Sequence, residues 1–221
     1  LLISHSRLPG SISEVLGIPQ SVSVDVLEGE GQAGRLDHRG PSLSDLRFGG
    51  GVIQDLGIHA LAPLFALEDY LGEIDQSFKE GTVKAVRNKE YLAMVKKNFK
   101  IPEKYIGESY AEIGFSTKKG VPVRVRVGKY FPGNKNQRGI TIMGSKNKLF
   151  LDLSSCILYL SGAKILEITK IPESKYCPVL RAALDLLAGK NPFYFDPITA
   201  ALRAQSLALN ILKKSHIINY T

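Results

Sequence analysis

The chain has 221 residues, and 44% of them are hydrophobic, which is enough to bury one sizeable core. Its formal net charge is +8, with a pI near 9.4. No apolar run approaches the roughly 18 residues of a membrane span, and no export signal is present, so we expect a cytoplasmic protein without membrane contact. Two cysteines, Cys156 and Cys177, imply neither a disulfide framework nor a metal clip, and we expect buried free thiols.

Apolar and polar patterning predicts the first elements along the chain. A strand is expected from 21 to 28, followed by a glycine-rich, charged loop from 29 to 51. The apolar residues that follow predict a single helix from about 52 to 70, which ends before Gly72. The lysine-rich segment 89–104 fits either a short helix or an insertion.

Strands dominate the middle of the chain. They are predicted at 82–87, 108–117, 121–130, 139–143, 148–153, 157–160 and 165–171. Because strands outnumber helices and connect through tight turns, we expect an α+β two-layer domain, in which a largely antiparallel, open-faced sheet carries its helices on one face. Exposed valines, tyrosines and Phe131 on the other face would favour a partner surface.

Two helices are predicted to close the chain. The first begins near Pro178 and stops at Gly189, while the second is capped by Asp196 and Pro197. Five residues of the second helix repeat at helical spacing, and we assign this stripe to the core: Ile198, Leu202, Gln205, Leu209 and Leu212.

The basic charge raises the alternative of a nucleic-acid module. Within 121–127, however, valines alternate with Arg124 and Arg126, which is the pattern of a half-buried strand with a solvated polar face. Lys118 to Gly120 form a turn before this strand, so Glu112 is expected to face the arginines across a hairpin. Known single-strand binders interleave aromatic and basic residues, and this chain does not. A basic mouth for an anionic sugar or a phosphorylated cofactor fits better than nucleic acid.

The candidate chemistry lies at the glycine run Gly49–Gly51. A helix begins there and carries Asp55 and His59 four residues apart, so that both lie on one helical face. Asp55 can orient a nearby imidazole, and His59 can exchange a proton near neutral pH. The alternative is a local surface pair with no role. A metal site is disfavoured because no third ligand is near.

The glycine run, Asp55, Gly57 and His59 together resemble the pattern G-G-G-x-x-x-D-x-G-x-H of the Gfo/Idh/MocA oxidoreductases, the family of glucose-fructose oxidoreductase and inositol dehydrogenase. Residues 142–152 resemble the family's glycine-turn strand pair, with Asn147 in place of a glycine. Residues 195–215 resemble its closing helix. The resemblance is to the C-terminal domain, whose fold is like that of the glyceraldehyde-3-phosphate dehydrogenase C-terminal domain.

The resemblance implies that residues 1–221 form a single substrate-binding and oligomerisation domain, which pairs subunits through its open sheet face. Family members also carry an N-terminal Rossmann domain, which binds NAD or NADP and supplies a lysine in an E-K-P motif. This chain has neither a G-x-G-x-x-G turn nor E-K-P, and it begins at Leu1 without a methionine. We therefore expect a C-terminal part of a larger enzyme, inactive without its nucleotide domain. Ala62 stands where the family often has an acidic residue.

The expected reaction is hydride transfer between a nicotinamide cofactor and a hydroxyl or carbonyl of a sugar, cyclitol or related polyol. His59 and Asp55 are the catalytic candidates, and Gly49–Gly51 form the loop near the cofactor. Four further residues are candidates for holding substrate, although each also fits an ordinary surface role: Arg39, Arg47, Lys129 and Tyr130. The alternative is a non-catalytic binding or oligomerisation module that retains the fold.

Overall fold

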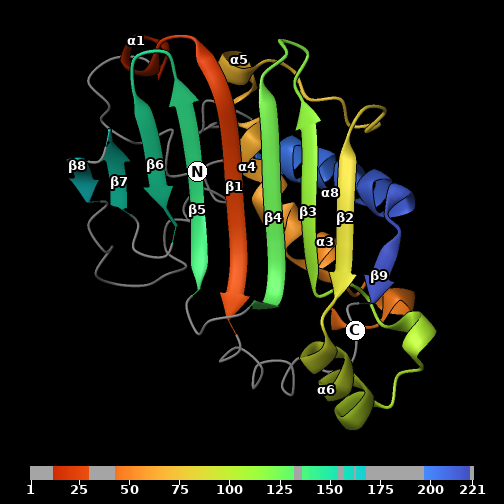
Figure 1. The fold of residues 1–221 in the computed structure, drawn as a ribbon. Helices are drawn as coiled ribbons and strands as arrows, with labels where there is room; N and C mark the ends of the chain where they lie inside the picture. The colour runs from red at the N-terminus through yellow and green to blue at the C-terminus, as the bar shows by residue number, and fades with distance from the viewer. Residues whose placement is uncertain are drawn as a thin grey trace, which may run out of the picture.

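A computed structural model describes residues 12–29, 43–131, 136–153, 157–161, 163–167 and 197–219. Its strands form one mixed sheet in the order β8-β7-β6-β5-β1-β4-β3-β2-β9 (Figure 1). Neighbouring strands pair antiparallel except for β1 with β4 and β2 with β9, which run parallel. The predicted α+β architecture with a largely antiparallel sheet is therefore confirmed.

The strand bounds follow the predicted order. They are β1 (Pro19–Gly29), β2 (Thr82–Arg87), β3 (Tyr110–Ser116), β4 (Pro122–Phe131), β5 (Gln137–Gly144), β6 (Lys148–Asp152), β7 (Ile157–Leu160), β8 (Ala163–Glu167) and β9 (Ile217–Asn219). The helices are α1 (Ile12–Leu16), α3 (Val52–Asp55), α4 (Gly57–Phe65), α5 (Glu68–Leu71), α6 (Lys89–Phe99) and α8 (Pro197–Lys214), with short 3-10 turns η4 (Leu46–Phe48) and η5 (Glu103–Tyr105). The sequence patterns did not predict α1 and β9.

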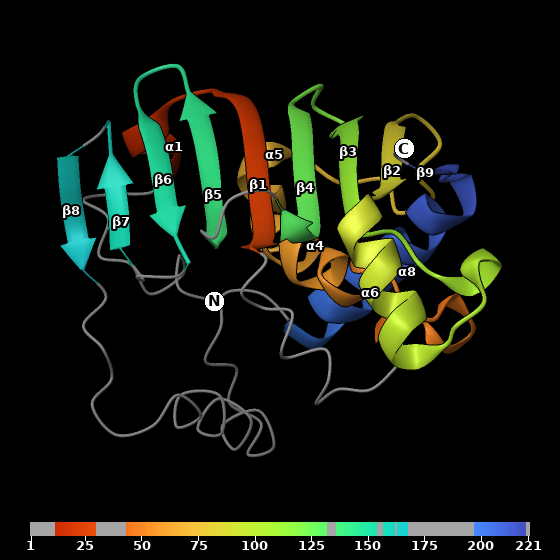
Figure 2. The same ribbon diagram turned by 60° about the horizontal axis from the view of Figure 1, so that its bottom comes forward.

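The core lies between the sheet and the helices α4 and α8, which cover one face of β4, β3 and β2 (Figure 2). Alternation places every second residue of β1 and β4 on this face, and these valines are buried: Val22, Val24, Val26, Val123, Val125 and Val127. A smaller apolar cluster forms under α6 around Tyr91. Within the ambiguous segment 89–104, residues 89–99 form the helix α6, which is started by Asn88, whose side chain accepts a hydrogen bond from the Tyr91 amide.

The face opposite the helices carries none of the valines of β1 and β4, which corrects the expectation of exposed valines there. Arg126 forms two hydrogen bonds of 2.6 Å to Asp25, and Arg124 donates to Glu112 at 2.9 Å, as the hairpin pairing predicted. The alternation within 121–127 predicted buried valines beside solvated arginines, and this is what β4 shows.

Apolar and aromatic side chains also lie on this open face. The strand register places Phe150 and Tyr159 there, and their ring centroids are 5.9 Å apart. Met143, on the same face, is 37% exposed.

The predicted single helix 52–70 is instead three short helices. Leu56 separates α3 from α4, and Ala66 and Leu67 separate α4 from α5. Pro63 lies inside α4 and cannot donate a backbone hydrogen bond. Asp55 therefore ends one helix, and His59 lies in the first turn of the next.

The stripe assigned to the core in the closing helix is wrong. Ile198, Leu202 and Leu209 are 61%, 62% and 41% exposed. The opposite side of α8 is buried, and it consists mainly of small residues: Ala200, Ala204, Leu207, Ala208 and Ile211. Small side chains allow α8 to approach α4 closely, which accounts for the burial of that side.

Several sequence predictions fall outside the described residues. These are the helix from Pro178 to Gly189, the environments of Cys156 and Cys177, the end of the strand predicted at 165–171, and the side chain of Phe131.

Candidate functional site

The glycine run Gly49–Gly51 is a close-packed turn. It joins η4 to α3 and packs against two other backbone segments, around Asp45 and Glu108. A Cβ on Gly50 would lie 2.3 Å from the Asp45 nitrogen, and one on Gly51 would lie 2.6 Å from Glu108 Oε2. Gly51 also has a φ of +108°, a conformation that other residues rarely adopt. The glycines are therefore needed for close packing of the backbone.

The five backbone amides of the turn all have partners within the chain. Gly49 N–H donates to Leu46 O, Gly50 N–H to Asp45 O, Gly51 N–H to Leu43 O, Val52 N–H to Glu108 O, and Ile53 N–H to Glu108 Oε1. A phosphate-binding loop needs amides that point to a ligand. This turn therefore does not fit the phosphates of a dinucleotide, although Gly49 does line a pocket.

Glu108 is the buried acid beneath the turn. Its side chain is fully buried, and Oε1 accepts the Ile53 amide at 2.7 Å, which holds the start of α3 in place. Burial raises the pKa of this carboxyl, partly opposed by hydrogen bonds and by the positive charges of Arg87 and Lys129. Glu108 Oε2 has no hydrogen-bond partner in the described part of the chain.

Asp55 pairs with Lys129. Lys129 Nζ lies 2.5 Å from Asp55 Oδ2, and the two side chains are 7% and 18% exposed. The contact is an ion pair without the angles of a good hydrogen bond, since neither atom has a hydrogen-bond partner in the structure as described. Lys129 follows the buried valines of β4 in the same alternation, so it points toward the helices rather than to the solvated face.

His59 does not share this arrangement. Its side chain is exposed, and among the described residues no hydrogen bond or ion pair joins it to Asp55. The expected Asp55–His59 contact is therefore not formed, because the carboxylate turns to the lysine instead. His59 remains accessible to solvent one turn beyond Asp55.

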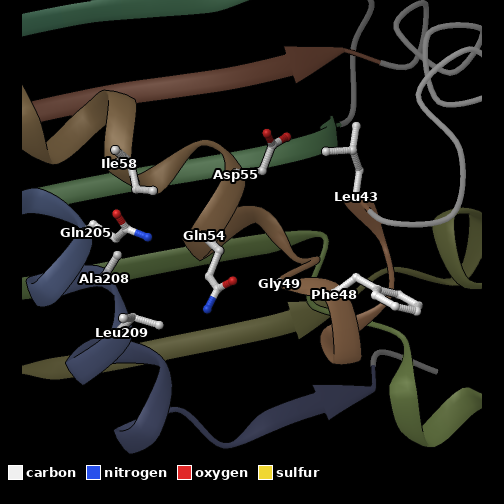
Figure 3. A pocket seen from close by; sticks show the side chains of 9 residues that line it. All are labelled: Leu43, Phe48, Gly49, Gln54, Asp55, Ile58, Gln205, Ala208 and Leu209. Carbon is white, nitrogen blue, oxygen red and sulfur yellow. The ribbon is translucent and has the colours of Figure 1, made fainter. Parts of the chain in front are cut away.

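A pocket of about 290 Å³ opens beside α3 (Figure 3). It is lined by Leu43, Phe48, Gly49, Gln54, Asp55, Ile58, Gln205, Ala208 and Leu209. Figure 3 shows the side chains of Gln54 and Asp55 coming from α3, and that of Gln205 from α8. Its size is at the lower end of ligand pockets, roughly 300–1,000 Å³, and its polar groups are two carboxamides and a carboxylate. His59 is not one of these lining residues.

The other substrate-binding candidates are placed differently. The Arg47 guanidinium forms an ion pair of 2.6 Å with Asp45 and lies 4.5 Å from the centre of the Tyr105 ring, so it is engaged at the edge of the turn. Tyr130 belongs to β4, but its side chain lies outside the described residues, as does Arg39. The pocket lining has no lysine or arginine among the described residues, so the basic mouth predicted from composition does not appear there.

Sequence reasoning missed Glu108, Gln54 and Gln205. Glu108 carried a weak signal as the first residue of the strand predicted at 108–117, two positions before β3 begins, and nothing in the sequence marked its burial. Within the described residues, no helix is long and apolar enough to cross a membrane, and no group of three His, Cys, Asp or Glu residues could hold a metal ion.

The fold matches solved oxidoreductases. A UDP-N-acetylglucosamine 3-dehydrogenase from Acidithiobacillus ferrooxidans shares 13% identity at a TM-score of 0.58, over 88% of this chain and 53% of that chain. A 3-ketoreductase from Actinomadura kijaniata, in complex with NADP and TDP-benzene, shares 14% identity at a TM-score of 0.59, over 94% of this chain and 57% of that chain. A biliverdin reductase from Synechocystis sp. PCC 6803, in complex with biliverdin and NADP+, shares 16% identity at 0.59, over 91% and 56%.

No family model matches the sequence, and no curated protein does. The chain spans about half the length of the solved structures that it matches. Its fold is that of the C-terminal domain of Gfo/Idh/MocA-type oxidoreductases, in agreement with the resemblance drawn from the glycine, Asp55 and His59 pattern.

Proposed function

We propose that this chain is the substrate-binding and catalytic half of an NAD(P)-dependent oxidoreductase that acts on a hydroxyl or carbonyl of a sugar, cyclitol or related polyol. The observation that carries the proposal is the pocket beside α3, whose lining includes the Asp55 carboxylate and the two carboxamides of Gln54 and Gln205. Carboxamides both donate and accept hydrogen bonds, which suits a ligand with several hydroxyl groups. Phe48 supplies an apolar ring at the same pocket.

The cofactor would be held mainly by a nucleotide-binding domain outside this chain. The five amides of the glycine turn are used internally, so the turn has no cradle for a pyrophosphate. Bound nicotinamide supplies or accepts hydride at the substrate carbon. This chain would bind and orient the substrate hydroxyl through Asp55. In the oxidation direction the hydroxyl proton would pass to the imidazole of His59, which is accessible one turn away and would release the proton to solvent.

The first test is ligand binding to the isotopically labelled chain. Addition of myo-inositol or D-glucose is expected to shift the side-chain amide NMR signals of Gln54 and Gln205 in a saturable way. The control is Asn147, whose side chain donates to Val15 O at 2.8 Å in a turn of the sheet. Equal shifts at all three side chains, or none, would contradict the proposed pocket.

The second test is turnover by the enzyme that contains this domain, with NAD+ and NADP+ and the same polyols. His59→Ala is expected to lower kcat on the order of 10²–10⁴-fold, the usual contribution of a general acid or base. Because His59 is exposed, its replacement should leave the unfolding temperature unchanged. Full turnover in His59→Ala would assign the proton transfer to another group.

A non-catalytic interaction module remains a second candidate, favoured by the apolar side chains that α8 exposes. Ile198 and Leu202 are 61% and 62% exposed, and large apolar side chains gathered on one surface favour contact with a partner. We also propose subunit pairing through the open face of the sheet, where Asp25 and Arg126 neutralise each other and the rings of Phe150 and Tyr159 stack. Sedimentation at equilibrium gives the test, because a monomeric mass at micromolar concentration would contradict pairing.

A further inference from the structure

Lys129 occupies a position at which the alternation of β4 would place another apolar residue. Val123, Val125 and Val127 of β4 point into the core, and Lys129 continues the same row, with its side chain 7% exposed. Its backbone amide donates to Ser109 O at 2.7 Å, which brings it beside Glu108. Burying an ammonium group costs free energy unless the group is paired with an anion. The presence of a lysine at this buried position therefore requires an explanation.

The ion pair with Lys129 gives the two carboxylate oxygens of Asp55 different surroundings. Oδ2 is buried and faces Lys129 Nζ at 2.5 Å, whereas the side chain as a whole is 18% exposed and lines the pocket. Oδ1 is therefore the oxygen that remains for a ligand. The lysine fixes the orientation of the carboxylate from behind.

Stability alone does not account for this ion pair. Replacing a buried ion pair with well-packed apolar residues is often neutral or stabilising, and Lys129 continues a row of valines in which an apolar residue would fit the pattern. Because Asp55, one member of the buried pair, also lines the pocket, a role in ligand binding explains the pair better. The pair preorganises a charged group, which a freely rotating surface carboxylate would not do.

We propose that Lys129 is the positioning residue of the pocket, whose buried ammonium holds Asp55 with Oδ1 toward the hydroxyl groups of a polyol. The inference rests on the proposed function, but its structural part can be tested without it. Glu108, the other carboxyl near Lys129, is fully buried, and burial raises its pKa. It therefore competes weakly for the ammonium, which remains with Asp55.

The experiment compares Lys129→Met with the parent chain. Its control is Arg124→Met, which removes a cation from the same strand but from the exposed pair on the opposite face. In the carboxyl-carbon NMR spectrum at neutral pH, we expect the Asp55 signal of Lys129→Met to move away from its position in the parent chain, because the adjacent cation is gone. Myo-inositol binding should weaken at least about tenfold, as expected when an oriented hydrogen bond to a charged group is lost. The control should change neither.

If Lys129→Met does not fold, Lys129→Gln keeps a polar side chain of similar length and serves the same purpose. An unchanged Asp55 carboxyl signal in the folded variant would overturn the inference, and so would unchanged binding. If the parent chain binds no polyol, the proposed function fails, whereas the Asp55 signal still decides whether Lys129 holds Asp55.

Discussion

Replacement of Glu108 by Gln tests the buried acid beneath the glycine turn. Gln keeps the oxygen that accepts the Ile53 amide and has nearly the shape of a protonated Glu. Burial is the largest cause of the raised pKa of Glu108. Because the folded pKa lies above the ordinary value of 4.5, the folded chain retains a proton that the unfolded chain releases as the pH rises.

The sign of the effect follows from this linkage. The stability that the bound proton contributes is fully present below the unfolded pKa and is lost as the pH rises to the folded pKa. The loss is about 1.4 kcal/mol per pH unit over that window. For a chain of this size, that corresponds to roughly 3–6 °C per pH unit in the unfolding temperature. Glu108→Gln lacks this loss, so it should match the parent in acid and exceed it increasingly above about pH 5.

Thermal unfolding measured at several pH values provides the assay. Glu112→Gln is the matched control with the opposite sign, because the hydrogen bond from Arg124 lowers the pKa of Glu112. The stability due to Glu112 is present above its unfolded pKa and is lost as the pH falls. The unfolding temperature of Glu112→Gln should therefore fall below that of the parent as the pH rises toward neutral. A Glu108→Gln variant less stable than the parent at every pH would refute the reasoning, since Glu108 would then be an ionised partner of Lys129 and Arg87.

Two further comparisons test the packing. Gly51→Ala places a Cβ 2.6 Å from Glu108 Oε2 and should cost more than about 2 kcal/mol, whereas Gly120→Ala, with a φ of +78° and open space, should cost about 1. Equal losses of unfolding free energy in urea titrations of the two variants would show that the backbone around Gly51 can move to accommodate the added Cβ. Leu207→Ala should cost about 2–5 kcal/mol, and Leu202→Lys less than about 0.5, because only the first side chain is buried. A larger loss for Leu202→Lys than for Leu207→Ala would instead support the core-facing stripe predicted from the sequence.

The sheet could be predicted because its signal is local. Alternation along β1, β4 and the hairpin before β4 is readable from residue order, and the Glu112–Arg124 contact followed from it. The closing helix could not be oriented in the same way, since it is apolar on two sides. Leucines dominated the pattern, but small residues such as Ala204 make the closer contact with α4.

The site was predicted in part, for a related reason. A spacing of four places Asp55 and His59 on one face only if the helix is continuous, and here it is interrupted at Leu56. The true partner, Lys129, lies 74 positions away and depends on how β4 meets α3, which no local pattern encodes. Its one local signal was a lysine in the alternation of the buried valines.

The glycine run pointed to the region of the candidate site, but its glycines serve backbone packing rather than phosphate binding. Its glycines are consistent with a phosphate loop, yet each amide from Gly49 to Ile53 is satisfied internally, and Gly51 instead gives room to the Glu108 carboxyl. The turn brings the start of α3 against a buried acid and, through Asp55, against a buried lysine. In this arrangement the chain would supply the charge and shape of the substrate pocket, and the nucleotide would have to come from elsewhere. Substitutions at Gly51 should therefore disturb the geometry of Asp55 before they disturb any phosphate contact.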